Sequence, residues 1–370
     1  MHLGKSSHLC TLIFLDQSMG LNIQEIRSLS QLLSKNQRIV ITTHQKPDAD
    51  ALGSSLALGL YLKKKGNEVN VISPTDYPDF LNWMAGNEEV IVFDNSNKEK
   101  IFKLIEQADI IFCLDFNSLD RINQLGKNVG SSPAVKVLMD HHLEPQNFAD
   151  HEFWDIEAAA TAEIVYEFII GSDERNLIDS EIAENLYAGL MTDTGGFRHS
   201  NTTKKTHSIA ADLMELGADV TRVSKLVYDN NTVDRIKFLG FALSEKLKVL
   251  TEDKVAYFAI SAKDLSKFNS KTGDTEGLVN YALSIEGIVV AALIIEKNDF
   301  IKISFRSVGN FSVNDFARAH FEGGGHRNAA GGISKLSLEE TVAKFEGLVK
   351  EYKDQIDNCV SSTLKQKSYN

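Results

Sequence analysis

Four short segments place histidine and aspartate side chains at spacings that suit the binding of divalent metal ions. The segment HQKPDAD holds His44, Asp48 and Asp50 within seven positions. The other three segments are centred on Asp115, on Asp140-His141-His142 and on Asp193 in TDTG. Carboxylates and imidazoles without thiolates suit Mn²⁺ or Mg²⁺ better than structural zinc. The set holds more carboxylates than one ion needs, which indicates two ions about 3.5–4 Å apart, an arrangement typical of phosphoryl chemistry.

Each segment also has an ordinary structural interpretation when it is considered alone. Asp48 or Asp50 could cap the helix that follows, by accepting hydrogen bonds from its first N–H groups. Asp115 could be a turn residue after a strand, and His141-His142 a polar strand end. These interpretations do not explain four such segments at one edge of a sheet, where unpaired carboxylates would repel one another. Divalent cations remove that repulsion, so we favour a metal site.

Five short apolar or β-branched runs in the first half of the chain predict strands, and three of them lead directly into these segments. The runs are Arg38–Thr43, Glu68–Ser73, Val90–Phe93, Asp109–Leu114 and Ala134–Met139. Amphipathic stretches separate several of them, such as Asp50–Lys65, which ends at Gly66 as a helix C-cap would. Buried strands alternating with helices predict an α/β fold with a doubly wound, mostly parallel sheet. In such sheets ligands collect at the carboxyl ends of the strands, so the polar segments should meet there.

Helices dominate the next part of the chain, and a second, smaller α/β domain follows. The helices are expected at Ala158–Ile170, Ser180–Met191 and Thr203–Leu216. Strands return at Lys254–Ile260, Gly287–Glu296 and Phe300–Arg306, with helices near Val313–His320 and Leu338–Lys353. We therefore expect an extension over 1–20, a first domain over 21–215, a linker over 216–236, a second domain over 237–353 and a polar tail over 354–370. A cleft is expected between the two domains.

The composition narrows the class of protein. At 370 residues and 43% hydrophobic, the chain can bury a substantial core. Its net charge of −12 argues against a broad electrostatic surface for long nucleic acid. Three distant cysteines fit a reducing compartment better than a disulfide framework. No apolar run approaches the roughly 18 residues that span a bilayer, and LCTLIFL lacks a clear signal cleavage site, so we expect a cytoplasmic protein with no membrane partner.

The four metal-site segments together resemble the sequence motifs of the DHH phosphoesterase family. HQKPDADALGS resembles the first motif, Asp115 the second, DHH at 140–142 the third and TDTG at 192–195 the fourth, all in order. In the second domain, SFRS at 304–307 and GGGHRNAAGG at 323–332 resemble the Arg-Ser and glycine-rich motifs of the DHH-associated C-terminal domain. The resemblance covers about residues 24–350.

The resemblance implies a role for each matching residue. One ion would be held by His44, Asp48 and Asp115, and a second by Asp50, Asp115, His141 and Asp193. Asp140 would complete the catalytic set, with His142 facing the substrate. Charge and backbone N–H groups of the second domain would grip a phosphate, through Arg306, Ser307, Gly324, Gly325 and His326. Arg198 and Ser200 would border the site, and a plain surface loop is the alternative there. Two Mn²⁺ ions are expected, with Mg²⁺ as the alternative.

Architecture selects among the substrates of the family. The inorganic pyrophosphatases have a C-terminal domain without GGGH, RecJ-type exonucleases carry further domains, and the membrane-bound cyclic dinucleotide phosphodiesterases carry transmembrane and sensory segments. The compact two-domain members hydrolyse very short RNA to mononucleotides and remove the 3′-phosphate of 3′-phosphoadenosine 5′-phosphate (pAp). We therefore expect these substrates, and a homodimer is compatible with the sequence. The alternatives are a dedicated cyclic di-AMP or pApA phosphodiesterase and a catalytically idle nucleotide sensor, although an idle relative usually lacks a metal residue.

Overall fold

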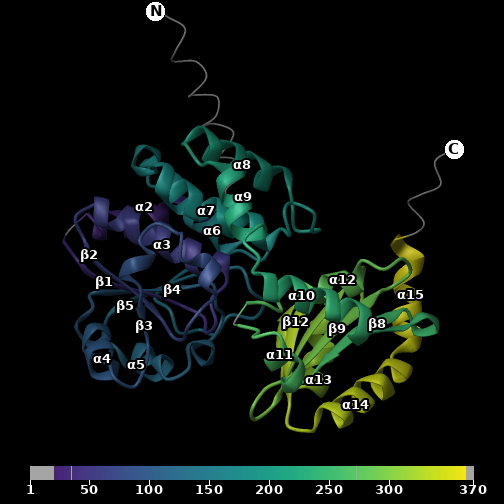
Figure 1. The fold of residues 1–370 in the computed structure, drawn as a ribbon. Helices are drawn as coiled ribbons and strands as arrows, with labels where there is room; N and C mark the ends of the chain where they lie inside the picture. The colour runs from purple at the N-terminus through teal and green to yellow at the C-terminus, as the bar shows by residue number, and fades with distance from the viewer. Residues whose placement is uncertain (1–20, 35, 272, 364–370) are drawn as a thin grey trace, which may run out of the picture. The chain divides into compact units, whose positions relative to one another are not determined.

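The structure is a computed structural model that describes residues 21–363 except residues 35 and 272. The chain divides into two compact units, and the division in the sequence falls between Asn230 and Asn231. We refer to them as the N-terminal and C-terminal units and describe each by itself (Figure 1). The expected extension over 1–20 and the end of the expected tail, 364–370, lie outside the described residues.

The N-terminal unit is built on a six-stranded, fully parallel sheet in the order β3-β2-β1-β4-β5-β6. The strands are β1 (Arg38–Thr43), β2 (Glu68–Ser73), β3 (Ile91–Val92), β4 (Ile110–Leu114), β5 (Val135–Asp140) and β6 (His151–Trp154). All five residues of β4 are buried, as expected for a central strand that is covered on both faces. The predicted doubly wound, mostly parallel sheet is confirmed, and β6 is a strand that the sequence analysis did not identify.

Eight α-helices are described in this unit, and they cover both faces of the sheet. They are α2 (Ile23–Leu32), α3 (Ala49–Lys64), α4 (Lys98–Gln107), α5 (Leu125–Ser131), α6 (Thr161–Gly171), α7 (Ser180–Asp193), α8 (Lys204–Glu215) and α9 (Val220–Tyr228). Successive strand residues point to opposite faces, so Ile111 joins the core under α4 and α5, while Phe112 joins the core under α3, α6 and α7. Figure 1 shows α4 and α5 on one side of the sheet and α3, α6 and α7 on the opposite side.

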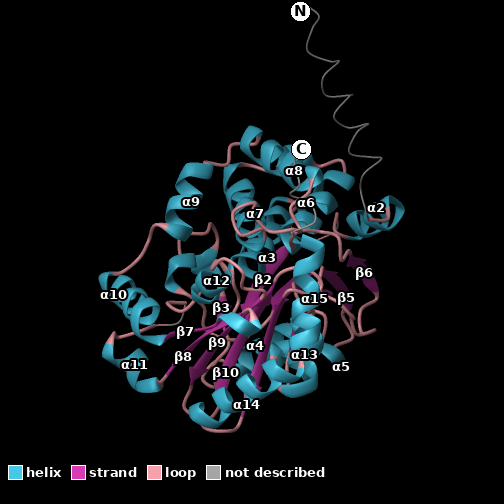
Figure 2. Cartoon of the chain, turned by 90° about the vertical axis from the view of Figure 1, so that its right-hand side faces the viewer, coloured by secondary structure: helices cyan, strands magenta, loops and turns pink. Residues whose placement is uncertain are grey.

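The C-terminal unit contains a second six-stranded sheet, in the order β11-β12-β10-β9-β8-β7. The strands are β7 (Leu247–Leu250), β8 (Val255–Ile260), β9 (Val290–Glu296), β10 (Ile301–Ser307), β11 (Gly324–His326) and β12 (Ala329–Ser334). Only β8 and β9 pair in parallel among the described strands of this sheet. The helices are α10 (Val233–Phe241), α11 (Ala262–Lys267), α12 (Leu278–Leu283), α13 (Val313–His320), α14 (Leu338–Glu351) and α15 (Lys353–Thr363). Separate apolar cores lie beneath α13 and α14 and beneath α10 and α12. Figure 2 shows these helices of the unit around the strands β8, β9 and β10.

Helices continue into the two segments that we expected to be a linker and a polar tail. The expected linker, 216–236, includes α9 and the start of α10, and Val223 and Val227 bury an apolar face of α9. The expected tail from 354 onward includes most of α15, where Ile356 and Cys359 join the core of the C-terminal unit. Short apolar spacings within polar sequence are easily missed in such cases.

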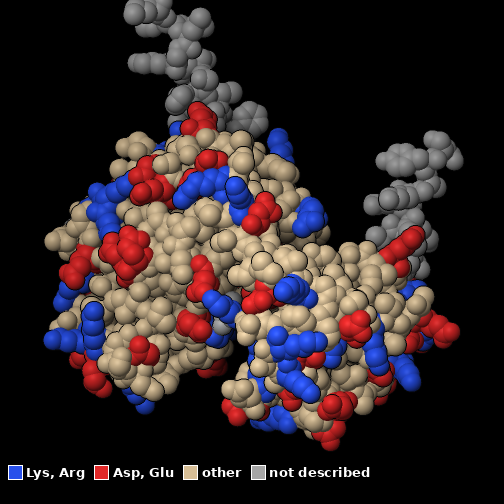
Figure 3. Space-filling view, viewed as in Figure 1, with Lys and Arg blue, Asp and Glu red and all other residues tan. Residues whose placement is uncertain are grey.

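The surface carries both signs of charge. Basic and acidic side chains are interspersed over the face of each unit that Figure 3 shows. Among the described residues, no helix combines the length and the apolar character that a membrane crossing requires.

Candidate metal centre

His44 lies in the loop that follows β1, and this loop ends at Asp48, the N-cap of α3. Asp48 Oδ1 accepts hydrogen bonds from the amides of Asp50 and Ala51, both at 3.0 Å. The capping interpretation therefore holds for Asp48, whose Oδ2 is not used by the cap. Asp50 lies inside the first turn of α3 instead, completely buried, so its carboxylate requires partners from elsewhere.

The partners of Asp50 are the first two amides of α6. The amide of Thr161 donates to Asp50 Oδ2 at 2.7 Å, and the amide of Ala162 donates to Oδ1 at 2.9 Å. The first N–H groups of a helix have no partner within the helix and carry partial positive charge, so they stabilise a buried carboxylate. Each oxygen of Asp50 retains a second lone pair that can bind an ion.

Asp115 follows β4 directly and is held in an uncommon backbone conformation. Its φ is +62°, in the left-handed region that aspartate and asparagine tolerate better than most residues. Its amide donates to the carbonyl of Met139 at the end of β5, at 3.0 Å. Asp115 Oδ2 lies 3.4 Å from His44 Nε2, and Oδ1 lies 3.5 Å from His141 Nε2. The two oxygens of one carboxylate thus face two different imidazoles.

The strand β5 ends in Asp140 and is followed by His141 and His142, which point in different directions. His141 Nε2 lies 3.4 Å from Asp193 Oδ2 and 4.0 Å from Asp50 Oδ2. Asp193 is the last residue of α7. His142 Nδ1 is 2.7 Å from Asp140 Oδ1, and this buried carboxylate fixes the orientation of the His142 ring.

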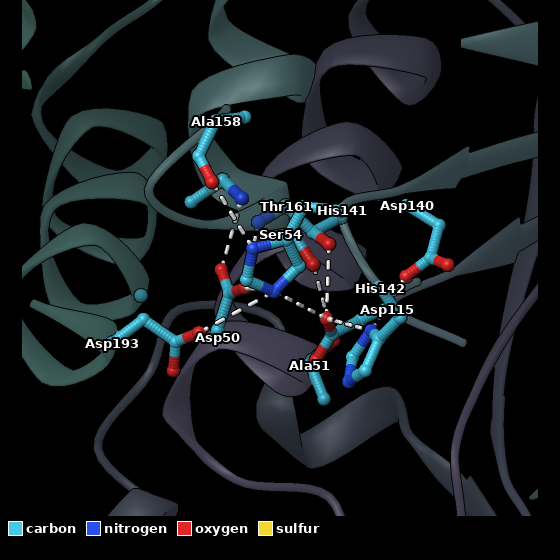
Figure 4. A network of polar contacts seen from close by, with 12 residues as sticks. Asp50, Ala51, Ser54, Asp115, Asp140, His141, His142, Ala158, Thr161 and Asp193 are labelled. Carbon is cyan, nitrogen blue, oxygen red and sulfur yellow. Dashed lines mark hydrogen bonds and ion pairs between the residues drawn. The ribbon is translucent and has the colours of Figure 1, made fainter. Parts of the chain in front are cut away.

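The side chains that follow β1, β4 and β5, together with Asp193 at the end of α7, form groups with the spacing of metal sites. Within each group the possible ligand atoms lie within 4.8 Å of one another. The groups in this unit are His44-Asp48-Asp115, Asp50-His141-Asp193 and Asp115-Asp140-His142. Figure 4 shows Asp50, Asp115 and His141 directed toward a common centre. Oxygen and imidazole ligands in a buried, acidic cluster suit divalent metal ions.

The protonation of the cluster in the absence of metal reflects this crowding. Burial, followed by the charge of Asp115, raises the pKa of Asp50 well above its usual value. Burial, followed by Asp50, likewise raises the pKa of Asp193. Burial alone would raise the pKa of Asp115, but hydrogen bonds from His141 and His44 outweigh it and lower that pKa. Asp50 and Asp193 therefore bind protons more readily than ordinary aspartates, in the place where cations would remove the repulsion.

The other predicted site residues are not among the grouped ligand atoms of this unit: two lie in the turn that follows Asp193, and the rest belong to the C-terminal unit. Arg198 and Ser200 lie in the exposed turn after α7, where Arg198 Nε donates to the carbonyl of Gly195 at 2.7 Å. In the C-terminal unit, Gly324, Gly325 and His326 form β11, and Arg306 lies on β10.

The glycine motif of the C-terminal unit is a β-hairpin rather than an irregular loop. A Cβ at position 323 would lie 2.0 Å from the carbonyl oxygen of Gly331 on β12, so only glycine fits there. The amide of Gly325 donates to the buried side chain of Asn314 at 2.9 Å. Ser307 is also buried: its hydroxyl donates to the carbonyl of Phe311 at 2.7 Å and accepts from Asn328 at 2.8 Å.

Three contributors to the cluster were not identified from the sequence. Thr161 donates its hydroxyl to Asp115 Oδ1 at 2.9 Å, and Asn201 donates to the carbonyl of Asp193 at 3.2 Å. Gly189 on α7 lies against Asp50. A threonine before an apolar run is a signal for a helix start, but nothing in the sequence indicated that this helix start faces the aspartates.

We expect Gly189→Ala to disturb the cluster. The added Cβ would lie 2.6 Å from Asp50 Oδ1 and 2.9 Å from Ala162 Cβ, so Asp50 must move. Overpacking of this kind costs about 1–3 kcal/mol of unfolding free energy, and the shift of Asp50 should weaken Mn²⁺ binding. Urea unfolding and Mn²⁺ titration measure the two effects.

A matched control is Gly347→Ala in α14, where no atom lies within 4 Å of the added Cβ. The control should be neutral or slightly stabilising, since alanine favours helix over glycine by up to about 1 kcal/mol. Wild-type stability and Mn²⁺ affinity in Gly189→Ala would contradict the close packing of α7 against Asp50.

Family models match both units of the chain. The model described as the DHH family, N-terminal domain, matches residues 38–190. The model of the DHHA1 domain matches residues 252–357. The first match contains the segments after β1, β4 and β5, and the second contains the β11–β12 hairpin.

Individual proteins are similar over most of the chain. The bifunctional oligoribonuclease and PAP phosphatase NrnA of Bacillus subtilis is 29% identical over 328 residues, which cover 88% of this chain and 98% of that protein. The crystal structure of an exopolyphosphatase-related protein from Bacteroides fragilis is 36% identical, with a TM-score of 0.87 over 92% of this chain and 99% of that one. The crystal structure of RecJ from Thermus thermophilus in complex with Mn²⁺ shares the fold, with a TM-score of 0.52 at 14% identity, over 90% of this chain and 55% of RecJ.

Proposed function

The chain belongs to the DHH phosphoesterase family, and on this premise we propose that it hydrolyses very short RNA to mononucleotides and removes the 3′-phosphate of pAp. One observation carries the proposal: the side chains of all four family motifs lie together in one largely buried cluster at the ends of β1, β4, β5 and α7. The B. subtilis relative is named as an oligoribonuclease and PAP phosphatase, and the alignment with it spans nearly its whole length, which supports these substrates.

Two divalent ions, Mn²⁺ or alternatively Mg²⁺, would be held by the residues of the two groups. His44, Asp48 and Asp115 would hold one, and Asp50, Asp115, His141 and Asp193 the other. When bound, such ions acidify water and stabilise the charge that builds on phosphoryl oxygens. The division of the Asp115 oxygens between His44 and His141 supports a bridging role for this carboxylate.

His142 is the proposed proton carrier. Asp140 contacts its Nδ1 and orients the ring, and Nε2 would exchange a proton with a substrate oxygen. Because Asp140 is completely buried, it acts through His142 and does not reach the substrate itself.

The C-terminal unit is proposed to bind a phosphate group of the substrate. Arg306 would supply charge, His326 would supply a hydrogen bond, and the absence of side chains at Gly324 and Gly325 would allow a phosphate to approach the backbone. Ser307 would act by fixing the loop that follows β10, since its hydroxyl is bonded to Phe311 and Asn328. Arg198 and Ser200, which are exposed, would border the substrate.

The acidic net charge of −12 favours short substrates, because a long strand would gain little from counterion release on such a surface. Cys113 is free and buried, and its burial raises the pKa of its thiol to about 12, which suits a reducing, cytoplasmic location. Neither observation requires a partner chain, and a homodimer is compatible with both.

A panel of substrates tests the proposal directly. The protein with Mn²⁺ would be given pApA, pAp, a pentanucleotide, a long RNA and cyclic di-AMP, with nucleotide products separated by chromatography. We expect the highest kcat/KM for pApA and release of phosphate from pAp. A preference for long RNA, or for cyclic di-AMP over pApA, would overturn the assignment. Failure to hydrolyse any phosphoester would overturn the enzymatic role itself.

We expect Arg306→Ala to raise KM for pApA by about 10–100-fold with a smaller change in kcat. A lost hydrogen bond to a charged group is worth about 1.5–3 kcal/mol, which corresponds to that range. Steady-state kinetics measure the split, and Lys302→Ala on the same strand is the control because Lys302 is exposed and outside the motif. An unchanged KM in Arg306→Ala would remove Arg306 from the substrate site.

A further inference from the structure

A single short stretch of chain, Ala158–Ala162 at the entry to α6, contacts three residues of the metal cluster. The three residues are Asp50, Asp115 and His141. His141 Nδ1 hydrogen-bonds to the carbonyl of Ala158 at 3.2 Å, which directs His141 Nε2 toward the carboxylates. The amides of Thr161 and Ala162 donate to Asp50, and the hydroxyl of Thr161 donates to Asp115 (Figure 4). Ligands that come from three different elements therefore share one support.

The stretch is itself anchored on both sides. The amide of Ala159 donates to Glu163 Oε2 at 3.3 Å, and its carbonyl accepts from Asn201 Nδ2 at 3.0 Å. Glu163 is buried and paired with Lys205 at 3.0 Å. Such anchoring limits the movement of the groups that contact the cluster.

The Thr161 hydroxyl contacts only one of the two oxygens of Asp115, and this contact restricts the rotation of the carboxylate. Oδ1, which accepts from Thr161 at 2.9 Å, is the oxygen that faces His141. Oδ2 faces His44. His142 Nδ1 also lies near Oδ1, at 3.7 Å. Rotation about the terminal bond of an aspartate is soft, so without the shorter contact to Thr161 the carboxylate could turn both oxygens toward one ion.

We propose that Thr161 is a positioning residue, whose hydroxyl holds the Asp115 carboxylate so that each oxygen serves a different metal ion. Thr161 is completely buried and Asp115 is 2% exposed, so water cannot replace the hydroxyl when it is removed. An ionised aspartate only accepts hydrogen bonds, so the hydroxyl donates to it. An ion held by Asp50, His141 and Asp193 would depend most on this contact, because Oδ1 is the oxygen of Asp115 that lies beside His141.

The inference rests on the metal sites of the proposed function, and its test is metal binding without substrate. Metal-free wild-type protein, Thr161→Val and Thr161→Ser would be titrated with Mn²⁺, and free Mn²⁺ followed by its electron paramagnetic resonance signal. We expect Thr161→Val to weaken one of two Mn²⁺ sites by about 10–100-fold, the usual effect of removing an outer partner of a metal ligand. Thr161→Ser retains the hydroxyl and should restore most of the affinity.

The control separates this role from ordinary packing. Thr341 in the C-terminal unit is equally buried, and its hydroxyl donates to Ser334 at 2.9 Å, so Thr341→Val removes a comparable hydrogen bond far from the ligands in sequence. We expect Thr341→Val to change stability without changing Mn²⁺ affinity. Wild-type affinity in Thr161→Val, or equal weakening in the valine and serine variants, would overturn the inference. A wild-type protein that binds two Mn²⁺ ions but cleaves no short RNA would overturn the proposed substrates and leave this test intact.

Discussion

Asp115→Asn is expected to lower kcat for pApA by more than about 10³-fold while the protein remains folded. Asp115 is the carboxylate whose oxygens face both His44 and His141, so its loss affects both proposed ion sites. Removing one preorganised group that stabilises transition-state charge commonly costs 10²–10³-fold in kcat, and a ligand shared by two ions should cost at least the upper value.

Asparagine is the informative substitution because the backbone at this position is left-handed, with φ at +62°. Asparagine tolerates that conformation, whereas alanine adds a penalty of roughly 1–2 kcal/mol. The amide oxygen of asparagine can still accept the Thr161 hydroxyl, so the fold is preserved while the charge is lost.

Rapid-quench kinetics with pApA measure the loss of turnover, and circular dichroism with urea unfolding establishes that the fold is retained. Mn²⁺ titration should show that both sites are weakened. Near-wild-type turnover in a folded Asp115→Asn would refute the two-ion scheme. Weakening of only one site would refute the bridging role of Asp115.

The second large effect concerns His142 and Asp140. His142→Asn should lower kcat by about 10²–10⁴-fold, the usual contribution of general acid–base catalysis, with little change in Mn²⁺ affinity. Asparagine can still donate to Asp140 but cannot carry a proton. Asp140→Asn should cost less, because it disturbs only the orientation of the ring that Asp140 Oδ1 contacts at 2.7 Å.

The double variant decides whether Asp140 acts through His142. Residues that work as one unit give non-additive losses, so the double variant should be no slower than His142→Asn alone. Steady-state kinetics of the four proteins in the presence of saturating Mn²⁺ complete the cycle. Additive losses would assign Asp140 an independent role, and a large loss of Mn²⁺ affinity in His142→Asn would make His142 a metal ligand.

The sheet of the N-terminal unit could be predicted because its signals are local. Apolar runs such as Arg38–Thr43 have the length and residue types of buried strands, and the polar residues after them mark the edge where parallel strands end. The strand β6 escaped prediction because HEFW is short and half polar, and its pairing with β5 depends on a neighbour rather than on its own pattern.

The supporting contacts of the cluster could not be predicted for the same physical reason. The amides that hold Asp50 are 111 and 112 positions away in the sequence, and the Thr161 hydroxyl is 46 positions from Asp115. Gly189 could not be identified for the same reason, because a glycine is required there only by the closeness of Asp50 on α3 and Ala162 on α6. Contacts of this kind follow from tertiary packing, which the pattern of a single segment does not encode.

The two units differ in one respect that bears on how the protein responds to heat. All the proposed metal ligands belong to the N-terminal unit, and each unit has apolar cores of its own. By mass action, a ligand that binds only the folded form stabilises it by about 2.7 kcal/mol at a hundred times its dissociation constant. Free Mn²⁺ should therefore shift the melting of the first unit and leave the second where it is. The melting temperature of this protein therefore depends on how fully its metal sites are occupied, and two measured values can be compared only at the same concentration of free metal.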